Sequence, residues 1–147
     1  MLSKKTKYAL KALEYIAKKS HGQPIQISEI AAFQKIPRKF LEVILLELKK
    51  DGILQSKMGK NGGYFLYKKA SEIEIGHVIQ LIDGPIALLP CVSYKYYVPC
   101  EDCQDEETCG LRNVMAEVRE ATQKILGKLT LADMIQREDL LKSKKKA

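Results

Sequence analysis

Residues 26–67 read QISEIAAFQKIPRKFLEVILLELKKDGILQSKMGKNGGYFLY, and this stretch decides the fold. Ser28 stands where a helix N-cap is expected, and a short helix with the apolar face Ile30, Ala31 and Phe33 follows it. Residues 34–36 form the predicted turn. Pro37 has the fixed φ that suits the first position of a second helix.

The second helix is predicted over residues 38–51. Its apolar residues recur at steps of three and four, as one face of an α-helix does: Phe40, Leu41, Ile44, Leu45 and Leu48. Gly52 is expected to end this helix. Two strands, residues 53–57 and 64–68, then flank a glycine-rich turn. The pattern therefore predicts a helix-turn-helix followed by a two-stranded wing.

A winged helix places its second helix in the DNA major groove, with the helix start near the base edges. The glycine-rich turn brings backbone and lysines close to a phosphate or to the minor groove. The candidate DNA-contacting residues are Ser28, Gln34, Lys35, Pro37, Arg38, Lys39, Ser56, Lys57, Gly59, Lys60, Asn61 and Gly62. The alternative is an apolar helical hairpin whose lysines are only a solvated face.

The charge distribution favours double-stranded DNA as the partner. The chain has a net charge of +7; residues 1–69 hold 15 Lys and Arg against 5 Asp and Glu, whereas residues 70–147 hold 10 against 13. No apolar run approaches the roughly 20 residues of a membrane span, and the N-terminus resembles no signal peptide. We therefore expect a cytoplasmic protein without a membrane partner. The absence of a catalytic triad or phosphate loop predicts that it is not an enzyme.

The rest of the chain predicts a mainly α fold in which the hairpin is the small β element. A first helix is expected over residues 3–19, capped by Ser3, and another over residues 75–82. A long helix over residues 110–129 has a narrow apolar stripe that predicts a homodimer seam, formed by Leu111, Val114, Val118, Ala121 and Ile125. A short helix over residues 130–135 and a disordered basic tail should complete the chain.

These elements divide the chain into four predicted segments. Residues 1–83 form the winged helix-turn-helix DNA-binding domain, and residues 84–109 form a sensor loop. Residues 110–136 contain the dimerisation helix and the short terminal helix, and residues 137–147 form the basic tail.

All four cysteines lie in or beside the sensor loop: Cys91, Cys100, Cys103 and Cys109. Thiolates are the ligands that iron–sulfur clusters, zinc and copper(I) prefer, and four sulfurs satisfy either tetrahedral zinc or a cluster. The spacing does not choose between an iron–sulfur cluster and zinc. Reduced, unliganded thiols are a further alternative. A thiol oxidoreductase using Cys100 and Cys103 is remote, because the pair lies in an acidic loop without a βαβ unit.

The chain resembles the Rrf-type winged-helix regulators, the group of IscR, NsrR and CymR. The resemblance covers nearly the full length and rests on six segments: Thr6–Leu10, Ile30–Ala31, Pro37–Leu41, Ser56–Tyr64, Ile82–Ile86 and Thr130–Met134. It implies a homodimeric transcription factor, usually a repressor, that often senses iron–sulfur status, nitric oxide, redox state or cysteine supply.

The resemblance is incomplete at the positions that such relatives use for cluster binding. Cys103 and Cys109 match the last two cysteines of the family pattern, but Tyr97 stands at the first. Arg112 replaces a histidine ligand of some relatives, and Lys7 replaces an acidic ligand of others. A cluster held by cysteines alone, with Cys91 or Cys100 completing the set, is therefore our first hypothesis. The second is structural zinc, or free thiols with a small-molecule or protein signal.

Overall fold

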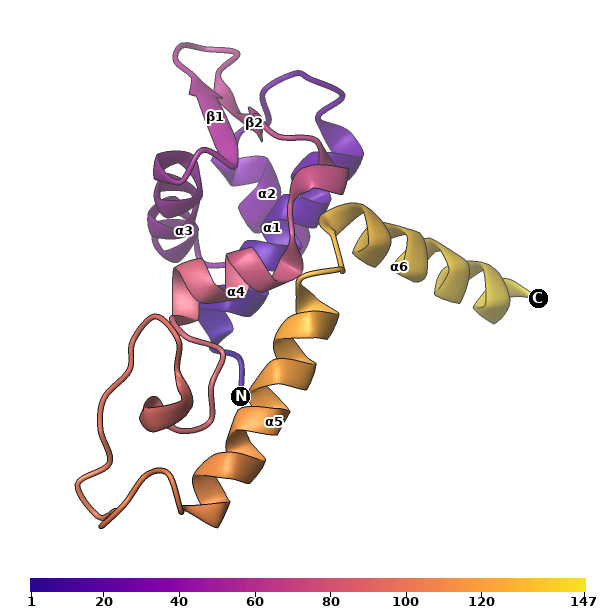
Figure 1. Ribbon diagram of the computed structural model, residues 1–147. Coiled ribbons are helices and arrows are strands. Elements are labelled where there is room, and N and C mark those ends of the chain that lie inside the picture. The colour runs from indigo at the N-terminus through magenta and orange to yellow at the C-terminus, as the bar shows by residue number, and fades with distance from the viewer.

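The computed structural model describes all 147 residues. It contains six α-helices, two short 3-10 helices and a two-stranded antiparallel sheet. Helices α1–α4 and the wing form a head, and an irregular loop and the long helix α5 extend from it (Figure 1). Helix α6 leaves the head sideways and carries the C-terminus (Figure 1). None of the helices has the length and apolar character that a membrane crossing requires. The predicted mainly α fold with a small hairpin is confirmed.

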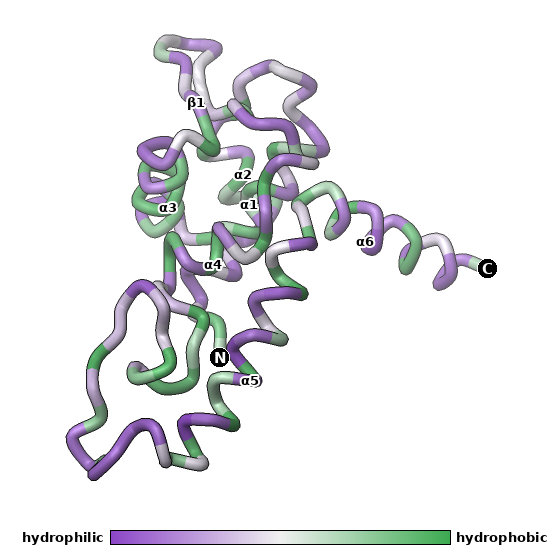
Figure 2. The backbone as a smooth tube through the Cα atoms, in the orientation of Figure 1, coloured by the Kyte–Doolittle hydropathy of each residue, from purple (hydrophilic) through white to green (hydrophobic).

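The head is built from three helices at the start of the chain: α1 (Lys4–Lys19), α2 (Ile27–Gln34) and α3 (Arg38–Lys50). Ser3 caps α1 as predicted, because its hydroxyl accepts a hydrogen bond from the Thr6 N–H. Fully buried side chains from these helices meet in one core, which includes Leu13, Ile16, Ile30, Leu41, Ile44, Leu45 and Leu48. The apolar segments of the tube meet there (Figure 2).

The wing pairs β1 (Leu54–Lys57) with β2 (Gly63–Leu66) in antiparallel register, with Leu54 opposite Leu66. An isolated bridge between Ile25 and Tyr64 ties β2 to the segment before α2. Gly63 permits this contact, because a Cβ atom there would lie 2.1 Å from the Ile25 carbonyl oxygen. The wing is therefore held to the head on the side of α2.

A short connection leads from the wing to the second half of the molecule. The 3-10 helix η1 (Ala70–Glu72) precedes α4 (Ile75–Asp83), and η2 (Pro90–Val92) lies within the loop. Helix α5 (Gly110–Leu126) leads to α6 (Leu131–Lys146). The Leu131 side chain is fully buried in the head core, so the chain returns to the head after α5.

Several local predictions were wrong. The N-cap of α2 is Gln26, because its carbonyl already accepts the Glu29 and Ile30 N–H groups, and Ser28 lies inside the helix. Pro37 caps α3 instead of opening it. Phe33 is 65% exposed and Phe40 is 37% exposed, since each lies at the edge of the apolar face. These two rings pack instead against Tyr15 and Tyr8 of α1.

The C-terminal region also differs from the prediction. The basic tail is not disordered, because α6 continues to Lys146. Thr130 and Asp133 form a capping box that starts the helix, and Lys18 of α1 pairs with Glu138 to hold its first half. These contacts anchor the helix well beyond residue 135.

Candidate nucleic-acid interface and cysteine loop

The start of α3 is exposed and positively charged. The Arg38 side chain is 65% exposed and its Nε lies 3.3 Å from Glu42 Oε1, while Lys39 and Lys35 are also exposed. No side chain caps α3, so its first-turn N–H groups remain available to an anion. Lys35 has a left-handed backbone conformation, which makes the tight turn between α2 and α3. This end of the helix has the charge and free donors that bind a phosphate.

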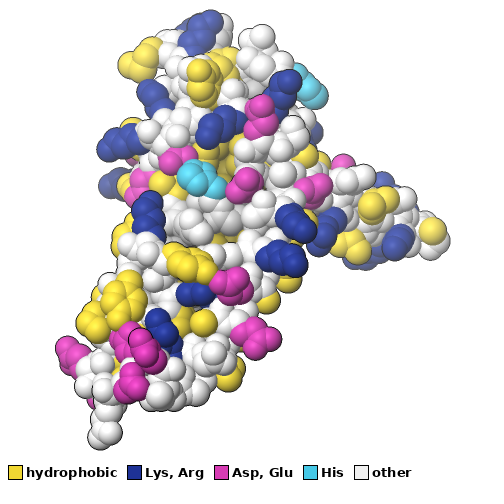
Figure 3. Space-filling model, viewed as in Figure 1, with side chains coloured by type: hydrophobic (Ala, Val, Ile, Leu, Met, Phe, Trp, Pro, Cys, Tyr) yellow, Lys and Arg dark blue, Asp and Glu magenta, His cyan; other side chains and the backbone are white.

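The wing adds lysines to the same edge of the molecule. Lys57, Gly59, Lys60 and Asn61 are exposed in the turn between β1 and β2. Lys and Arg side chains line the edge formed by the wing and α3, whereas acidic side chains gather over the cysteine loop (Figure 3). The structure therefore separates the basic edge from the acidic loop.

Three of the predicted DNA-contacting residues make contacts within the chain. Gly62 is buried, and its N–H donates to the Gly59 carbonyl at 3.0 Å within the turn. The Gln34 side-chain amide donates to the Lys11 carbonyl oxygen at 3.1 Å, which joins α2 to α1. The Ser56 hydroxyl accepts from Lys49 Nζ at 2.6 Å. Ser28 and Pro37 are exposed, and DNA contact by any of these residues stays a prediction.

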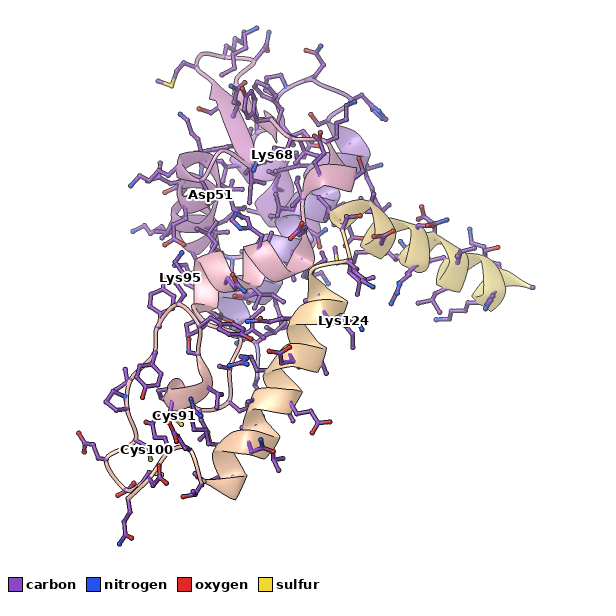
Figure 4. The ribbon with its side chains drawn as sticks, viewed as in Figure 1. Asp51, Lys68, Cys91, Lys95, Cys100 and Lys124 are labelled. Carbon is purple, nitrogen blue, oxygen red and sulfur yellow. The ribbon has the colours of Figure 1, made fainter.

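The cysteine loop, residues 84–109, contains its sulfurs in different environments. Cys91 is buried, Cys103 and Cys109 are half-buried, and Cys100 is exposed; all four are free thiols. Cys91 lies in η2, whereas Cys100 lies in a different part of the loop (Figure 4). Cys109 is the N-cap of α5, and its Sγ accepts from the Arg112 N–H at 3.4 Å. No three Cys, His, Asp or Glu side chains are arranged to hold a metal ion.

Cys103 is the thiol most affected by its neighbours. Burial raises the pKa of Cys103, and the adjacent Cys109 and Cys100 sulfurs raise it further, while the Asp105 backbone opposes the shift. The Cys100 and Cys109 sulfurs therefore lie near the Cys103 sulfur, although the three do not form a closed site. Three neighbouring soft donors fit the ligand preference of an iron–sulfur cluster or zinc, and binding would release their protons.

Glu106 organises the exposed part of this loop. Its carboxylate accepts the Tyr97 hydroxyl at 2.6 Å and the Cys100 N–H at 3.2 Å, and it lies 3.7 Å from Arg112 Nε. The Tyr97 and Cys100 donors lower the pKa of Glu106, and the same contact raises the pKa of Tyr97. The conformation around Cys100 thus depends on an ionised carboxylate.

Two arginines of α5 fasten the other part of the loop. Arg112 Nε donates to the Cys91 carbonyl oxygen at 3.3 Å, and Arg119 Nη1 donates to the Val92 carbonyl oxygen. Arg119 also stacks 3.8 Å from the centre of the Tyr94 ring, and its Nη2 donates to the Tyr94 hydroxyl at 2.9 Å. Sequence reasoning missed these contacts, although the seven-residue spacing of the two arginines marks one face of a helix.

The predicted dimer stripe lies on the free side of α5. All five of its residues are exposed: Leu111, Val114, Val118, Ala121 and Ile125. Other residues of α5 face the molecule, because a Cβ at Gly76 of α4 would lie 3.1 Å from Leu126 Cβ. The stripe is therefore apolar, contiguous along the helix and uncovered within one chain.

Comparisons with known proteins identify the family to which this chain belongs. A family model described as "Rrf2: Iron-dependent Transcriptional regulator" matches residues 2–137. The chain is 44% identical to the rrf2-like HTH-type transcriptional regulator of Rhodobacter capsulatus over 138 residues, which cover 92% of each protein. It is 31% identical over 140 residues to the HTH-type transcriptional regulator IscR of Serratia proteamaculans, covering 95% of this chain and 82% of IscR.

A solved structure has the same arrangement of elements. CymR, the global cysteine regulator of B. subtilis, superposes with a TM-score of 0.75 at 26% identity, covering 93% of this chain and 97% of CymR. The winged-helix head, the loop and the C-terminal helices therefore belong to an arrangement seen in a solved regulator.

Proposed function

Because this chain belongs to the Rrf2 family of transcriptional regulators, we propose that it is a homodimeric DNA-binding repressor whose cysteine loop responds to iron–sulfur or redox status. The observation that carries the DNA-binding part is the basic edge, which we define as the exposed residues Arg38 and Lys39 of α3 and Lys57 and Lys60 of the wing. Arg38 and Lys39 lie at the uncapped start of α3, and the wing packs beside the last turn of this helix, where Lys49 donates to Ser56. Such a surface suits a duplex and its phosphates.

Each part of the basic edge has a distinct task in this proposal. Arg38 and Lys39 enter the major groove at the start of α3, where a guanidinium binds a guanine edge or a phosphate. Lys57 and Lys60 of the wing bind the neighbouring backbone, so they add affinity without sequence preference. Gly59 and Asn61 keep the tip small enough for the close approach.

The DNA proposal is tested with a duplex selected by the protein from a random-sequence pool. Arg38→Ala should weaken binding of that duplex by several-fold or more in a gel-shift titration, while Arg137→Ala on α6 should leave affinity unchanged. Wild-type affinity should fall steeply with salt, because lysines and arginines displace counterions. Equal affinity of the two variants, or binding insensitive to salt, would contradict the proposal.

The dimer proposal rests on the uncovered stripe of α5. A DNA-binding protein that inserts one recognition helix into each half-site generally binds as a two-fold dimer, with the two recognition helices about 34 Å apart. Val118 of the stripe also lines a hollow together with Leu126 and Leu2, so this hollow lies beside the stripe. Val118→Glu should yield a monomer in analytical ultracentrifugation, and Lys124→Glu should stay dimeric. A dimeric Val118→Glu variant would refute this seam.

The sensing proposal assigns ligand roles to the neighbouring Cys100, Cys103 and Cys109, with Cys91 as the candidate fourth ligand. A bound cluster would supply a redox-sensitive charge at the loop. The chain's own contribution is positioning: Arg112 and Arg119 join the backbone at Cys91 and Val92 to α5, which carries the stripe. Any change in loop order is thereby passed to the seam and to the spacing of the two heads.

Protein purified without oxygen tests the sensing proposal by visible absorption and by assays for iron and sulfide. A coloured wild type and a colourless Cys103→Ser variant support an iron–sulfur cluster, and Thr108→Ser is the control for a change in the same loop. Stoichiometric zinc that survives oxidation would instead support a structural metal. A metal-free protein that binds the selected duplex equally with and without iron would overturn sensing.

A further inference from the structure

A cavity of about 400 Å³ lies where the head, the loop and α5 meet. Asp51 at the end of α3 and His77 and Gln80 of α4 line one part, while Lys95 of the loop and Gln123 of α5 line the other. Ligand pockets in proteins span roughly 300–1,000 Å³, so this cavity has room for a small metabolite. It contains none of the four cysteines and none of the residues of the basic edge.

The walls of this cavity combine opposite charges with apolar surface. Asp51 supplies a carboxylate, whose Oδ2 lies 2.7 Å from His77 Nε2. Lys95 supplies an exposed ammonium group, which lies 5.8 Å from the centre of the Tyr96 ring. Asp51 and Lys95 lie on the same side of α4 (Figure 4). The apolar part of the wall comes from Leu81 and Ile86.

We propose that this cavity binds a free α-amino acid. The ligand carboxylate pairs with Lys95, its ammonium group pairs with Asp51, and its side chain lies against Leu81 and Ile86. The amides of Gln80 and Gln123 provide further donors and acceptors. A zwitterion pairs with both charges of the wall, whereas a simple anion would pair with Lys95 alone and a simple cation with Asp51 alone.

The cavity connects a bound ligand to α3, the helix that is proposed to enter the major groove. Asp51 is the C-cap of α3, and Lys95 belongs to the loop segment that Arg119 joins to α5 through Val92 and Tyr94. A molecule that contacts both Asp51 and Lys95 links the end of α3 to the loop. Binding of the amino acid should therefore change the affinity for DNA, and this consequence rests on the proposed function. Binding of the amino acid to the cavity does not depend on the proposed function.

Binding is tested on the full-length protein without DNA. The melting temperature is measured with each proteinogenic L-amino acid in turn, and hits are titrated by calorimetry. At least one amino acid should raise the melting temperature, because a ligand that binds only the folded state stabilises it. The matched amine without the carboxylate, and the matched 2-oxo acid without the ammonium group, should bind at least about tenfold more weakly. No shift with any amino acid would overturn the proposal.

Two variants locate the site. Lys95→Met and Asp51→Asn should each weaken the bound amino acid by about tenfold or more, since each removes one charge-assisted contact. Lys124→Met, an exposed lysine of α5 outside the cavity, should bind like the wild type. Lys95 is exposed, so its replacement should leave the fold intact. Unchanged affinity in Lys95→Met would exclude this cavity.

A gel shift with the selected duplex separates this proposal from the proposed function. If the amino acid fails to bind while the duplex binds, only the cavity proposal fails. If the duplex fails to bind while the amino acid still raises the melting temperature, the DNA proposal fails and the cavity proposal stands.

Discussion

The head and the cysteine loop of this chain are held in place by different forces. The head has one core of 17 buried residues, drawn from α1–α4, the wing and the start of α6. In the loop, residues 84–109, only Cys91, Val92 and Ser93 are buried. The loop is held by hydrogen bonds to charged groups, chiefly Glu106, Arg112 and Arg119. Apolar burial does not depend on protonation, whereas the contacts that Glu106 accepts do, so this part of the loop is suited to respond to chemistry.

The largest effect is expected in the head core. Leu45→Ala should lower the free energy of unfolding by about 3 kcal/mol, because Leu45 is fully buried and its truncation leaves a cavity. Urea unfolding followed by circular dichroism measures this loss. DNA binding should fall with it, since the same helix carries Arg38.

The neighbouring residue gives a matched control for that substitution. Leu46 has the same side chain on the same helix but is 45% exposed. Leu46→Ala should therefore change the free energy of unfolding by less than about 1 kcal/mol. Equal losses in the two variants would show that α3 does not bury the predicted face.

An intermediate effect is expected where the loop meets α5. Arg119→Met keeps the aliphatic stem but removes the donors to the Val92 carbonyl and the Tyr94 hydroxyl. Hydrogen bonds to charged groups contribute about 1.5–3 kcal/mol, so the loop should open at least about tenfold more often. Faster hydrogen exchange at the Val92 and Ser93 amides measures this opening.

The control for Arg119 is an arginine of α6. Arg137→Met should leave exchange in the loop unchanged, because Arg137 is exposed on α6 and lines no part of the loop. Amides of the head core should exchange at the same rate in both variants. Slower or unchanged exchange at Val92 in Arg119→Met would contradict the contrast between core and loop.

The head could be predicted from sequence because its order comes from periodic burial. Four of the five apolar positions predicted for α3 are buried, and the exception, Phe40, lies beside Tyr8 at the edge of the helix face. Ser28 was misplaced because an N-cap preference does not reveal that the Ile25–Tyr64 bridge fixes where the chain turns into α2. Local sequence preference located the helices of the head to within a few residues, and pairing with the wing set the start of α2.

The loop could not be predicted in the same way, because its contacts have no period. The Cys91 and Val92 carbonyl oxygens accept from Arg112 and Arg119, which are far from them in sequence, and no periodic pattern indicates which segment the arginines contact. The length of α6 was missed for a related reason. Its lysine-rich end has no apolar face, and the pairing of Lys18 with Glu138 that anchors its first half joins residues far apart in the chain.

The smallest effect is expected from acid at the Glu106 contacts of the loop. Tyr97 and Cys100 hold the pKa of Glu106 below its ordinary value of 4.5. The ionised carboxylate therefore stabilises the loop fully above pH 4.5, and this contribution is lost as the pH falls through the lowered pKa. NMR shifts of the Cys100 amide and the Tyr97 ring should stay constant from neutral pH to about 4.5 and change below it.

Glu106→Gln tests whether this carboxylate is the cause. The variant keeps the shape of the side chain but has no charge to lose, so the altered Cys100 and Tyr97 signals should be present at neutral pH and should not titrate. Glu107→Gln, the adjacent residue with its side chain outside these contacts, should titrate like the wild type. Signals of buried core residues such as Leu45 should be unaffected in all three proteins, because their neighbours in the core are apolar. An acid transition shared by the head and the loop would mean that the two regions are ordered by one set of forces.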